Sequence, residues 1–326
     1  MKAVWYEANG AAKDVLAHGE MPHATPSNGE VLVRLHASGV NPSDVKARAG
    51  LRPMGFCRVI PHSDGAGMVE AVGSGVDPSL IGTRVFVRNG QWQRAFGTAA
   101  EYVTLPEGLV HVLPDATSYA VGAALGIPAM TAAHAVLKDG PVDGQTVLVH
   151  GGGGTVARLV VQIATDSGAR VIATTGDSDK ADWIREAGAV AVLDYRDPDL
   201  ASAVAAVAGS GEVSRIIDGE CGRNLATSCD IICIKGTIVG YGSALAPAPE
   251  LAFLKMMFKE VTLTSVLVYL LEEAASNAYA AIIADMLERG VLDVAVAAAL
   301  PLTKAAQAHR LVETGNRRGA VILTID

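Results

Sequence analysis

The chain has 326 residues, half of them apolar and 18% charged, with a formal net charge of −8 at neutral pH. This length is too great for one small core and suits two domains. An acidic chain whose longest basic run is Arg317–Arg318 is not expected to bind nucleic acid. No stretch approaches the roughly 18 uncharged apolar residues of a membrane span, so we expect no membrane association.

The start of the chain and its cysteines point to a cytoplasmic protein. Met1–Glu7 lacks a long apolar core and reaches an acid at once, so we expect no secretion signal. Three of the four cysteines, Cys221, Cys229 and Cys233, lie close together in the sequence but contain no Cys-x-x-Cys pair. We therefore expect these three to be buried thiols rather than metal ligands, and we expect no disulfide framework among the four cysteines, which include Cys57.

The first third of the chain has the pattern of a β-rich domain. Val31–Ala37 and Gly82–Val87 are predicted strands, and glycine and proline interrupt the sequence throughout. This pattern predicts a compact, barrel-like domain with long functional loops.

From about Ala120 apolar strands alternate with helical stretches, which predicts a parallel, doubly wound sheet. A helix is expected over Val156–Ser167, and a second over Ser178–Ala187 with Ser178 as its N-cap. The predicted strands of this sheet are Thr146–His150, Arg170–Thr174, Ala189–Leu193, Ser214–Asp218, Thr237–Gly240 and Val261–Val266.

The end of the chain is predicted to return to the first domain. It contains two helical stretches, Glu272–Arg289 and Lys304–Thr314, followed by a strand over Ala320–Ile325. The fold class is therefore α/β: a Rossmann domain over residues 123–267, inserted into a β-rich domain formed by residues 1–122 and 268–326.

A glycine run, Gly151–Gly154, separates the first strand of the Rossmann pattern from its helix. Gly152 permits a tight turn, Gly154 lets backbone amides approach a pyrophosphate, and Ala157 is small enough for the helix to pack on the sheet. The N-terminus of the helix then faces the phosphates. The alternative is a flexible turn, but the strand–loop–helix setting favours a dinucleotide site.

The next strand indicates which dinucleotide binds. NAD sites place an acid at the strand tip, about 20 residues on, to hold the ribose 2′-hydroxyl. Here the strand ends in Thr174-Thr175-Gly176, Asp177 comes slightly late, and Lys180 follows. A 2′-phosphate would be attracted by Lys180, so NADPH is the expected cofactor. Lys180 as an ordinary solvated helix residue remains the alternative.

Several motifs spread over the whole chain carry a family resemblance. They are Ser38–Asp44, Ile60–Gly67, Phe96–Tyr102, Gly126–Ala132, the glycine run and Leu193–Arg196. With these motifs the chain resembles the zinc-independent quinone oxidoreductases, a branch of the medium-chain dehydrogenase/reductase superfamily that includes zeta-crystallin. The resemblance implies that the β-rich domain is GroES-like and that the protein is an NADPH-dependent enzyme.

The resemblance also implies roles for individual residues. Lys180 and Tyr195 would grip the 2′-phosphate, while Asn41 and Thr131 would line the nicotinamide pocket. The loop Tyr241–Ser243 would lie beside this pocket. For Tyr195 and Tyr241 the alternative to cofactor binding is an aromatic side chain packed at the edge of the core. The full set expected to bind the cofactor is Asn41, Thr131, Gly152, Gly153, Gly154, Thr155, Val156, Thr175, Gly176, Lys180, Tyr195, Tyr241, Gly242 and Ser243.

The chain departs from both the zinc enzymes and the common quinone oxidoreductase pattern. Asn41 and Ser63 stand where zinc alcohol dehydrogenases have metal ligands, so no metal site is expected. His62 replaces a common glycine, Lys46 stands where several relatives have an aromatic residue, and Thr155 replaces a glycine of the loop.

Without a metal, the reaction depends on positioning the cofactor and the acceptor. The expected catalytic residues are Asn41, as an orienting donor, and Lys46, as a stabiliser of the developing oxyanion if it reaches inward. The expected acceptor is a quinone. An enone or enoyl thioester is the second candidate acceptor, and a non-enzymatic NADPH-binding, crystallin-like role is the third possibility.

A homodimer is expected, joined through Val261–Val266.

Overall fold

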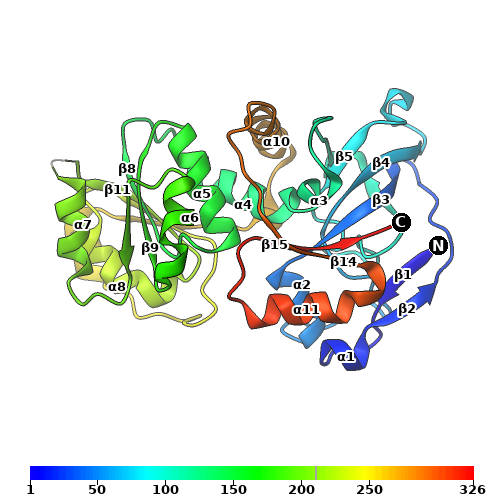
Figure 1. Cartoon of the computed structure of the whole chain (residues 1–326), viewed down its shortest axis with the longest axis horizontal. Coiled ribbons are helices and arrows are strands. Elements are labelled where there is room, and N and C mark those ends of the chain that lie inside the picture. The colour runs from blue at the N-terminus through cyan, green and yellow to red at the C-terminus, as the bar shows by residue number, and fades with distance from the viewer. Residues whose placement is uncertain (210) are drawn as a thin grey trace. The chain divides into compact units, whose positions relative to one another are not determined.

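The computed structural model describes residues 1–209 and 211–326, which form two compact units (Figure 1). Unit 1 comprises Met1–Pro128, Glu272–Arg289 and Val294–Asp326, and unit 2 comprises Ala129–Leu271 and Gly290–Asp293. The sequence placed the boundaries after residues 122 and 267, whereas the chain passes between the units after residues 128 and 271 and returns to unit 2 for four residues.

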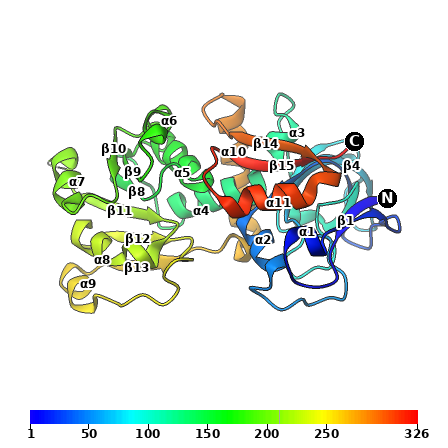
Figure 2. The same cartoon turned by 60° about the horizontal axis from the view of Figure 1, so that its bottom comes forward.

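Unit 2 is built on a six-stranded parallel sheet with the order β10-β9-β8-β11-β12-β13 (Figure 2). Numbered along the chain this order is 3-2-1-4-5-6, the strand order of a Rossmann fold. The strands are β8 Thr146–Val149, β9 Arg170–Thr175, β10 Ala191–Asp194, β11 Val213–Asp218, β12 Thr237–Gly240 and β13 Thr262–Ser265.

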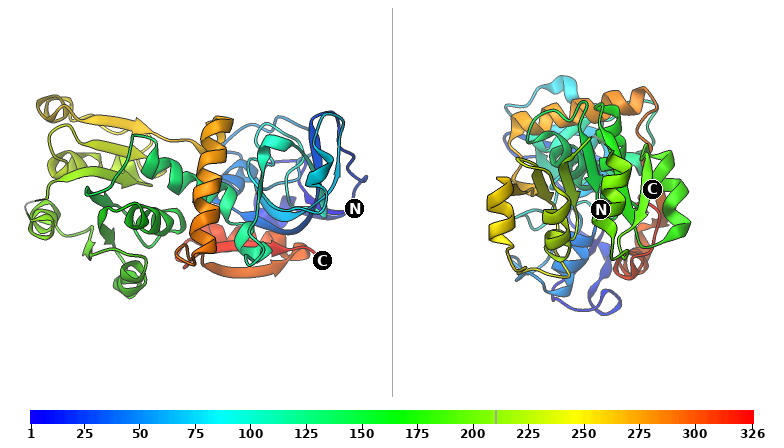
Figure 3. Two further views of the ribbon diagram at one scale, coloured as in Figure 1. Left: turned by 90° about the horizontal axis from the view of Figure 1, so that it is seen from above. Right: turned by 90° about the vertical axis from the view of Figure 1, so that its left-hand side faces the viewer.

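Helices lie on both sides of this sheet, as the right-hand view of Figure 3 shows. Because both faces are covered, the central strand β8 is buried along its whole length, which explains its apolar sequence. Helix α5 packs on β8, β9 and β11, and α7 and α8 pack on each other and on the sheet. The helices of unit 2 are α4 Met130–Leu137, α5 Thr155–Asp166, α6 Ala181–Glu186, α7 Leu200–Ala208, α8 Cys221–Ile231 and α9 Phe253–Lys259.

Two predictions for unit 2 were wrong in detail. The segment expected to be one helix from Ser178 begins as a 3-10 turn, Ser178–Lys180, and continues as α6. Its cap is Asp177, whose carboxylate accepts a hydrogen bond from the Asp179 amide at 3.1 Å. Of the three cysteines expected to be buried, only Cys229 is buried, whereas Cys221 and Cys233 are partly exposed.

Unit 1 contains a seven-stranded sheet with the order β14-β15-β3-β4-β5-β7, in which β6 also pairs with β3. Only β14 and β15 pair in parallel, and a separate two-stranded sheet joins β1 to β2. The strands are β1 Lys2–Trp5, β2 Ala17–Glu20, β3 Glu30–Val40, β4 Asp64–Val72, β5 Arg84–Val87, β6 Tyr102–Pro106, β7 Val110–Val112, β14 Val296–Pro301 and β15 Ala320–Thr324.

Strand β3 organises unit 1, because its 11 residues pair with β4, β6 and β15. Alternate apolar residues of β3, including Val31, Val33 and Leu35, lie in the core. The amphipathic helix α11 covers this region with Ala308 and Val312. The helices of unit 1 are α1 Ala12–Val15, α2 Pro42–Ala49, α3 Tyr119–Gly122, α10 Glu273–Glu288 and α11 Ala305–Thr314.

No helix among the described residues is long and apolar enough to cross a membrane.

Candidate functional site

The glycine run forms a tight turn between β8 and α5. Gly151 has φ +65°, a left-handed conformation that favours glycine, and Gly154 is the N-cap of α5. Thr174 at the end of β9 holds the turn, because its carbonyl accepts from the Gly152 amide at 2.8 Å and its hydroxyl from the Gly151 amide at 3.2 Å. Gly154 provides no side-chain cap and the first turn of α5 has no acidic residue, so the positive end of this helix suits an anion.

Two predicted phosphate ligands lie against glycines, Lys180 over the glycine loop and Tyr195 over Gly176, which follows β9. A Cβ added to Gly153 would lie 2.7 Å from Cδ of Lys180, so the lysine stem passes directly over the loop. A Cβ added to Gly176 would lie 2.5 Å from Cζ of Tyr195, so the phenol ring covers that glycine. The absence of a side chain at Gly153 and Gly176 therefore leaves room for Lys180 and Tyr195 to pass close to the backbone at these two points.

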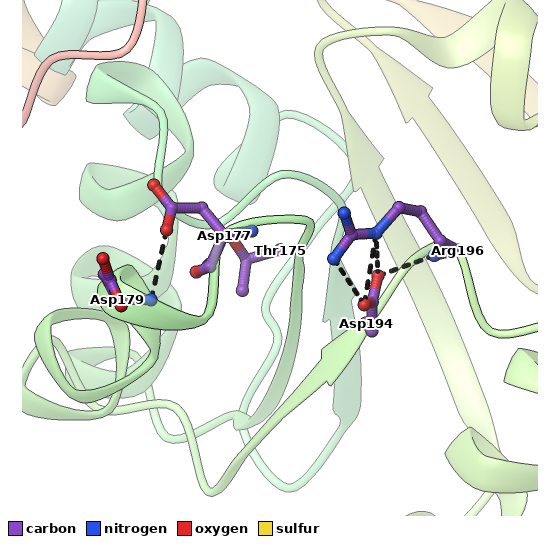
Figure 4. A network of polar contacts seen from close by, with 5 residues as sticks. All are labelled: Thr175, Asp177, Asp179, Asp194 and Arg196. Carbon is purple, nitrogen blue, oxygen red and sulfur yellow. Dashed lines mark hydrogen bonds and ion pairs between the residues drawn. The ribbon is translucent and has the colours of Figure 1, made fainter.

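Charged groups of both signs surround this edge (Figure 4). Asp177 lies 3.9 Å from Nζ of Lys180, and its backbone amide donates to Thr175 Oγ1 at 3.1 Å. Arg196 donates to both carboxylate oxygens of Asp194, with Nη2–Oδ2 at 2.7 Å, and these hydrogen bonds lower the pKa of Asp194 to about 2. A phosphate at this edge would compete with Asp177 for Lys180.

The loop that follows β12 packs against the loop that follows β11. A Cβ on Gly219 would lie 2.7 Å from the Tyr241 hydroxyl, and one on Gly242 would lie 2.5 Å from the Gly219 carbonyl oxygen. The Ser243 hydroxyl accepts from the Gly222 amide at 3.1 Å. Burial raises the pKa of Tyr241, helped by Asp218 and Glu220, so the phenol remains protonated. The predicted Tyr241–Ser243 segment is therefore a fixed turn at the carboxyl edge of the sheet.

The expected catalytic residue Asn41 is a buried N-cap in unit 1. It precedes α2, whose first residue is Pro42, and its backbone amide donates to Asp44 Oδ2 at 2.8 Å. Its side-chain Nδ2 donates to Asp64 Oδ2, also at 2.8 Å. Two carboxyl groups thus fix both the backbone and the side chain of Asn41. Thr131, expected in the same pocket, lies buried in α4 of unit 2.

Burial dominates the electrostatics around Asn41. Burial raises the pKa of Asp44 to about 7, although the hydrogen bond from the Asn41 amide and the charge of Arg52 lower it in part. Burial also raises the pKa of Asp64 well above its ordinary value, while the bond from the Asn41 side chain lowers it and the charge of Asp44 raises it. These carboxyl groups are positioned to hold Asn41 in a region where a charge is costly.

The other expected catalytic residue, Lys46, has an exposed side chain in the last turn of α2. Its inward reach toward a reacting oxygen therefore stays a prediction.

Two residues beside the glycine loop were missed by the sequence analysis. They are Thr174, which holds the loop, and His150, whose Nδ1 lies 3.2 Å from the Thr174 hydroxyl. The only sequence signal for either was its place at the end of a strand beside the loop.

In the described part of the chain, no group of three or more histidine, cysteine, aspartate or glutamate side chains lies where it could hold a metal ion. At the positions of the zinc ligands of alcohol dehydrogenases, Asn41 is an amide already bonded to Asp64, and Ser63 is a buried serine.

Known proteins resemble this chain over its whole length. Residues 27–115 match the alcohol dehydrogenase GroES-like domain, and residues 155–287 match the family described as zinc-binding dehydrogenase. A quinone oxidoreductase from Sus scrofa is 31% identical over 92% of this chain and 90% of its own. The chain belongs to the quinone oxidoreductase family of medium-chain dehydrogenases/reductases.

Solved structures agree with this family. A mycobacterial protein in complex with NADPH is 30% identical, with a TM-score of 0.88 over all of both chains. Another structure, described as an NAD-dependent alcohol dehydrogenase, is 28% identical, with a TM-score of 0.90 over all of both chains. The family membership confirms an α/β oxidoreductase with a GroES-like and a Rossmann domain, while the choice between the two cofactors depends on the residues at the site.

Proposed function

We propose that this protein is an NADPH-dependent reductase that transfers hydride to a quinone-type acceptor without zinc. The observation that carries the proposal is the passage of Lys180 over Gly153 and of Tyr195 over Gly176. This arrangement provides a cation and a phenol hydroxyl at the edge of a dinucleotide loop, where the 2′-phosphate distinguishes NADPH from NADH.

NADPH supplies the hydride when it is bound. The chain's own residues bind and orient the reactants: Gly152–Gly154 and the amides at the start of α5 receive the pyrophosphate, while Lys180 and Tyr195 hold the 2′-phosphate. Asn41, fixed by Asp44 and Asp64, orients the nicotinamide and the acceptor. Lys46 is proposed to stabilise negative charge on the acceptor oxygen as hydride arrives.

An acceptor screen tests this function. Purified protein is supplied with NADPH or NADH and with a panel of quinones, enones and enoyl thioesters, while oxidation of the cofactor is followed by absorbance. We expect turnover of quinones with NADPH and a reduced kcat in Lys46→Met. Turnover of enones alone would replace the quinone assignment. Tight NADPH binding without any turnover would indicate the non-enzymatic, crystallin-like role.

The proposal that zinc is not needed rests on the chemistry of Asn41 and Ser63. Neither an amide nor a serine hydroxyl is a usual zinc ligand, and the Asn41 amide is already bonded to Asp64. We expect full activity after dialysis against a chelator and less than one equivalent of zinc per chain by elemental analysis. Loss of activity that zinc restores would contradict this.

We also propose a homodimer formed through β13, the edge strand of the unit 2 sheet. Exposed apolar side chains gather on this strand and on the nearby α9: Leu263 is 42% exposed, Phe253 61% and Phe258 77%. Pairing two such edges about a two-fold axis would satisfy the open backbone groups and cover these side chains. Light scattering should give twice the monomer mass, and Leu263→Lys should lower it. A monomeric wild type would contradict this.

The cytoplasmic location and the absence of nucleic-acid binding stay predictions.

A further inference from the structure

A chain of four buried polar side chains runs through unit 1 and plays no part in the function proposed above. Nε2 of His309 on α11 lies 2.9 Å from Nε2 of His62, and Nδ1 of His62 lies 2.9 Å from the Ser38 hydroxyl on β3. The Ser38 hydroxyl lies 2.8 Å from the Thr98 hydroxyl, which donates to the Asp64 carbonyl oxygen. All four side chains have an exposed fraction of 0%. We call these four residues the buried His–Ser–Thr chain.

With both imidazoles neutral, the hydrogen bonds of this chain permit only one arrangement of protons. Because Thr98 donates its one proton to a carbonyl, which can only accept, its oxygen must accept from Ser38. Ser38 has then used its proton, so it must accept from Nδ1–H of His62. Neutral His62 therefore accepts at Nε2, and His309 must donate from its Nε2–H. Every bond points from α11 toward Asp64.

The direction of donation shows what the buried His–Ser–Thr chain cannot do. It ends on a backbone carbonyl, which takes up no proton, so it does not deliver a proton to a substrate. It ends, however, on Asp64, the residue whose carboxyl group holds the Asn41 side chain at 2.8 Å. The chain therefore fixes the residue that fixes Asn41.

His62 adopts a conformation that would be easier for the glycine it replaces. Its φ is +78°, in the left-handed region, which L-residues rarely adopt. Such a conformation persists where surrounding contacts determine it. Here the contacts are the two ring hydrogen bonds of His62 and the hydrogen bond that its carbonyl accepts from the Thr98 amide at 3.0 Å.

The surroundings keep both imidazoles neutral, as this arrangement of protons requires. Burial, with the charge of Arg48 second, lowers the pKa of His309 to about 3. Burial, followed by the charge of His309, lowers the pKa of His62 well below its ordinary value. Arg48 is itself buried and paired with Glu313 on α11. His309 Nδ1 carries no proton in this arrangement, and it has no hydrogen-bond partner in the described residues.

We propose that His62 and His309 are positioning residues for Asn41, acting through the proton-ordered chain Ser38–Thr98–Asp64. The proposal rests on the proposed role of Asn41 in orienting nicotinamide and acceptor. It predicts that interrupting the chain lowers the rate of turnover much more than cofactor affinity, because the phosphate contacts proposed for Lys180, Tyr195 and the glycine loop lie in unit 2 and do not involve Asn41.

A matched pair of serines tests the proposal. Ser38→Ala removes a fully buried hydroxyl bonded to buried His62, and Ser276→Ala removes a fully buried hydroxyl bonded to buried His111 at 3.0 Å in the same unit. Both variants should lose thermal stability, because each removes a buried hydroxyl from a buried histidine. We expect kcat to fall about 5- to 10-fold in Ser38→Ala only, because this variant also breaks the contact to Thr98 and interrupts the chain, with a much smaller change in the Kd for NADPH in both variants. Equal kcat values in the two variants would overturn the proposal.

A second measurement needs no acceptor and so separates this proposal from the proposed function. Nitrogen-15 NMR of histidine-labelled wild-type protein at pH 7, assigned with His62→Gly and His309→Gln, reports the ring tautomers. We expect neutral His62 with its proton on Nδ1 and neutral His309 with its proton on Nε2. A charged ring, or a proton on Nε2 of His62, would overturn the proposal even if no acceptor is ever found.

Discussion

The two regions that carry the proposed function are built in opposite ways. In unit 2 the cofactor region is an open edge formed by backbone amides, glycines and partly exposed charges such as Lys180 and Arg196. In unit 1 the Asn41 region is closed, with Asp44, Asp64, His62 and their partners all buried. The open edge can accept a large anionic ligand, whereas the closed region keeps one amide in a single orientation. Substitutions should therefore affect binding in the first region and turnover or stability in the second.

The largest effect is expected from filling the glycine loop. A Cβ on Gly152 would lie 3.0 Å from the Ala173 Cβ and 3.1 Å from Ile184 Cγ2, so Gly152→Val overpacks the turn and displaces the loop amides proposed to receive the pyrophosphate. We expect the Kd of both NADPH and NADH to rise about 100-fold, within the 1–3 kcal/mol typical of overpacking. Fluorescence titration measures this. Gly55→Ala, where nothing lies within 4 Å, is the control and should bind normally. Normal binding by Gly152→Val would contradict the assignment of the loop.

The next largest effect is expected in the closed region around Asn41, as a dependence of native stability on pH. The pKa of Asp44 is raised from 3.8 to about 7, so between these values the native state holds a proton that the unfolded state has lost. Native stability therefore falls as pH rises through this window, by up to about 1.4 kcal/mol per pH unit for one proton. Asp44→Asn removes this slope. The melting temperature of the variant relative to wild type should increase from pH 4 to pH 7.

The buried histidines do not disturb that comparison. The pKa values of His62 and His309 are lowered, so their contribution to stability is lost as pH falls below about 6.5, in the opposite direction. Because both proteins contain these histidines, their effect cancels in the difference between variant and wild type. A difference that stays constant with pH would show that Asp44 is not held protonated.

The smallest effect is expected at the open edge. Tyr195→Phe removes one neutral hydroxyl from a ring that is 43% exposed. The loss of a single such hydrogen bond should weaken NADPH binding roughly 3-fold. NADH, which has no 2′-phosphate, should bind as it does to wild type and so serves as the internal control. An equal loss for both cofactors would mean that Tyr195 packs on Gly176 without contacting the phosphate.

The same contrast explains what could be predicted from the sequence. The Rossmann strands and the loop residues were predictable because a parallel sheet places successive strand ends at one edge, which also brings Lys180 and Tyr195 to the glycines. The cap at Asp177 was missed because Asp177 and Ser178 are adjacent residues with similar capping ability. Strand β14 was missed because its sequence is rich in alanine, a residue depleted in strands.

The closed region was less predictable for a different physical reason. Its hydrogen bonds join residues that are far apart in the chain, and His309 lies 247 residues from His62. The resemblance marked His62 as a departure from the family, but no local pattern indicates which side chain a buried imidazole will meet. Only the pairing of β3 with β4, and the packing of α11 on this sheet, bring these groups together.

The most direct test is the ratio of the dissociation constants of NADH and NADPH, measured by fluorescence titration in wild type and in Lys180→Met. We expect wild type to bind NADPH at least about tenfold more tightly, the effect of one charge-assisted hydrogen bond. Lys180→Met should bring the two constants together. Lys255→Met, which removes an exposed lysine of α9 paired with Asp230, should leave the ratio unchanged. Equal or tighter binding of NADH by wild type would contradict an NADPH-dependent enzyme.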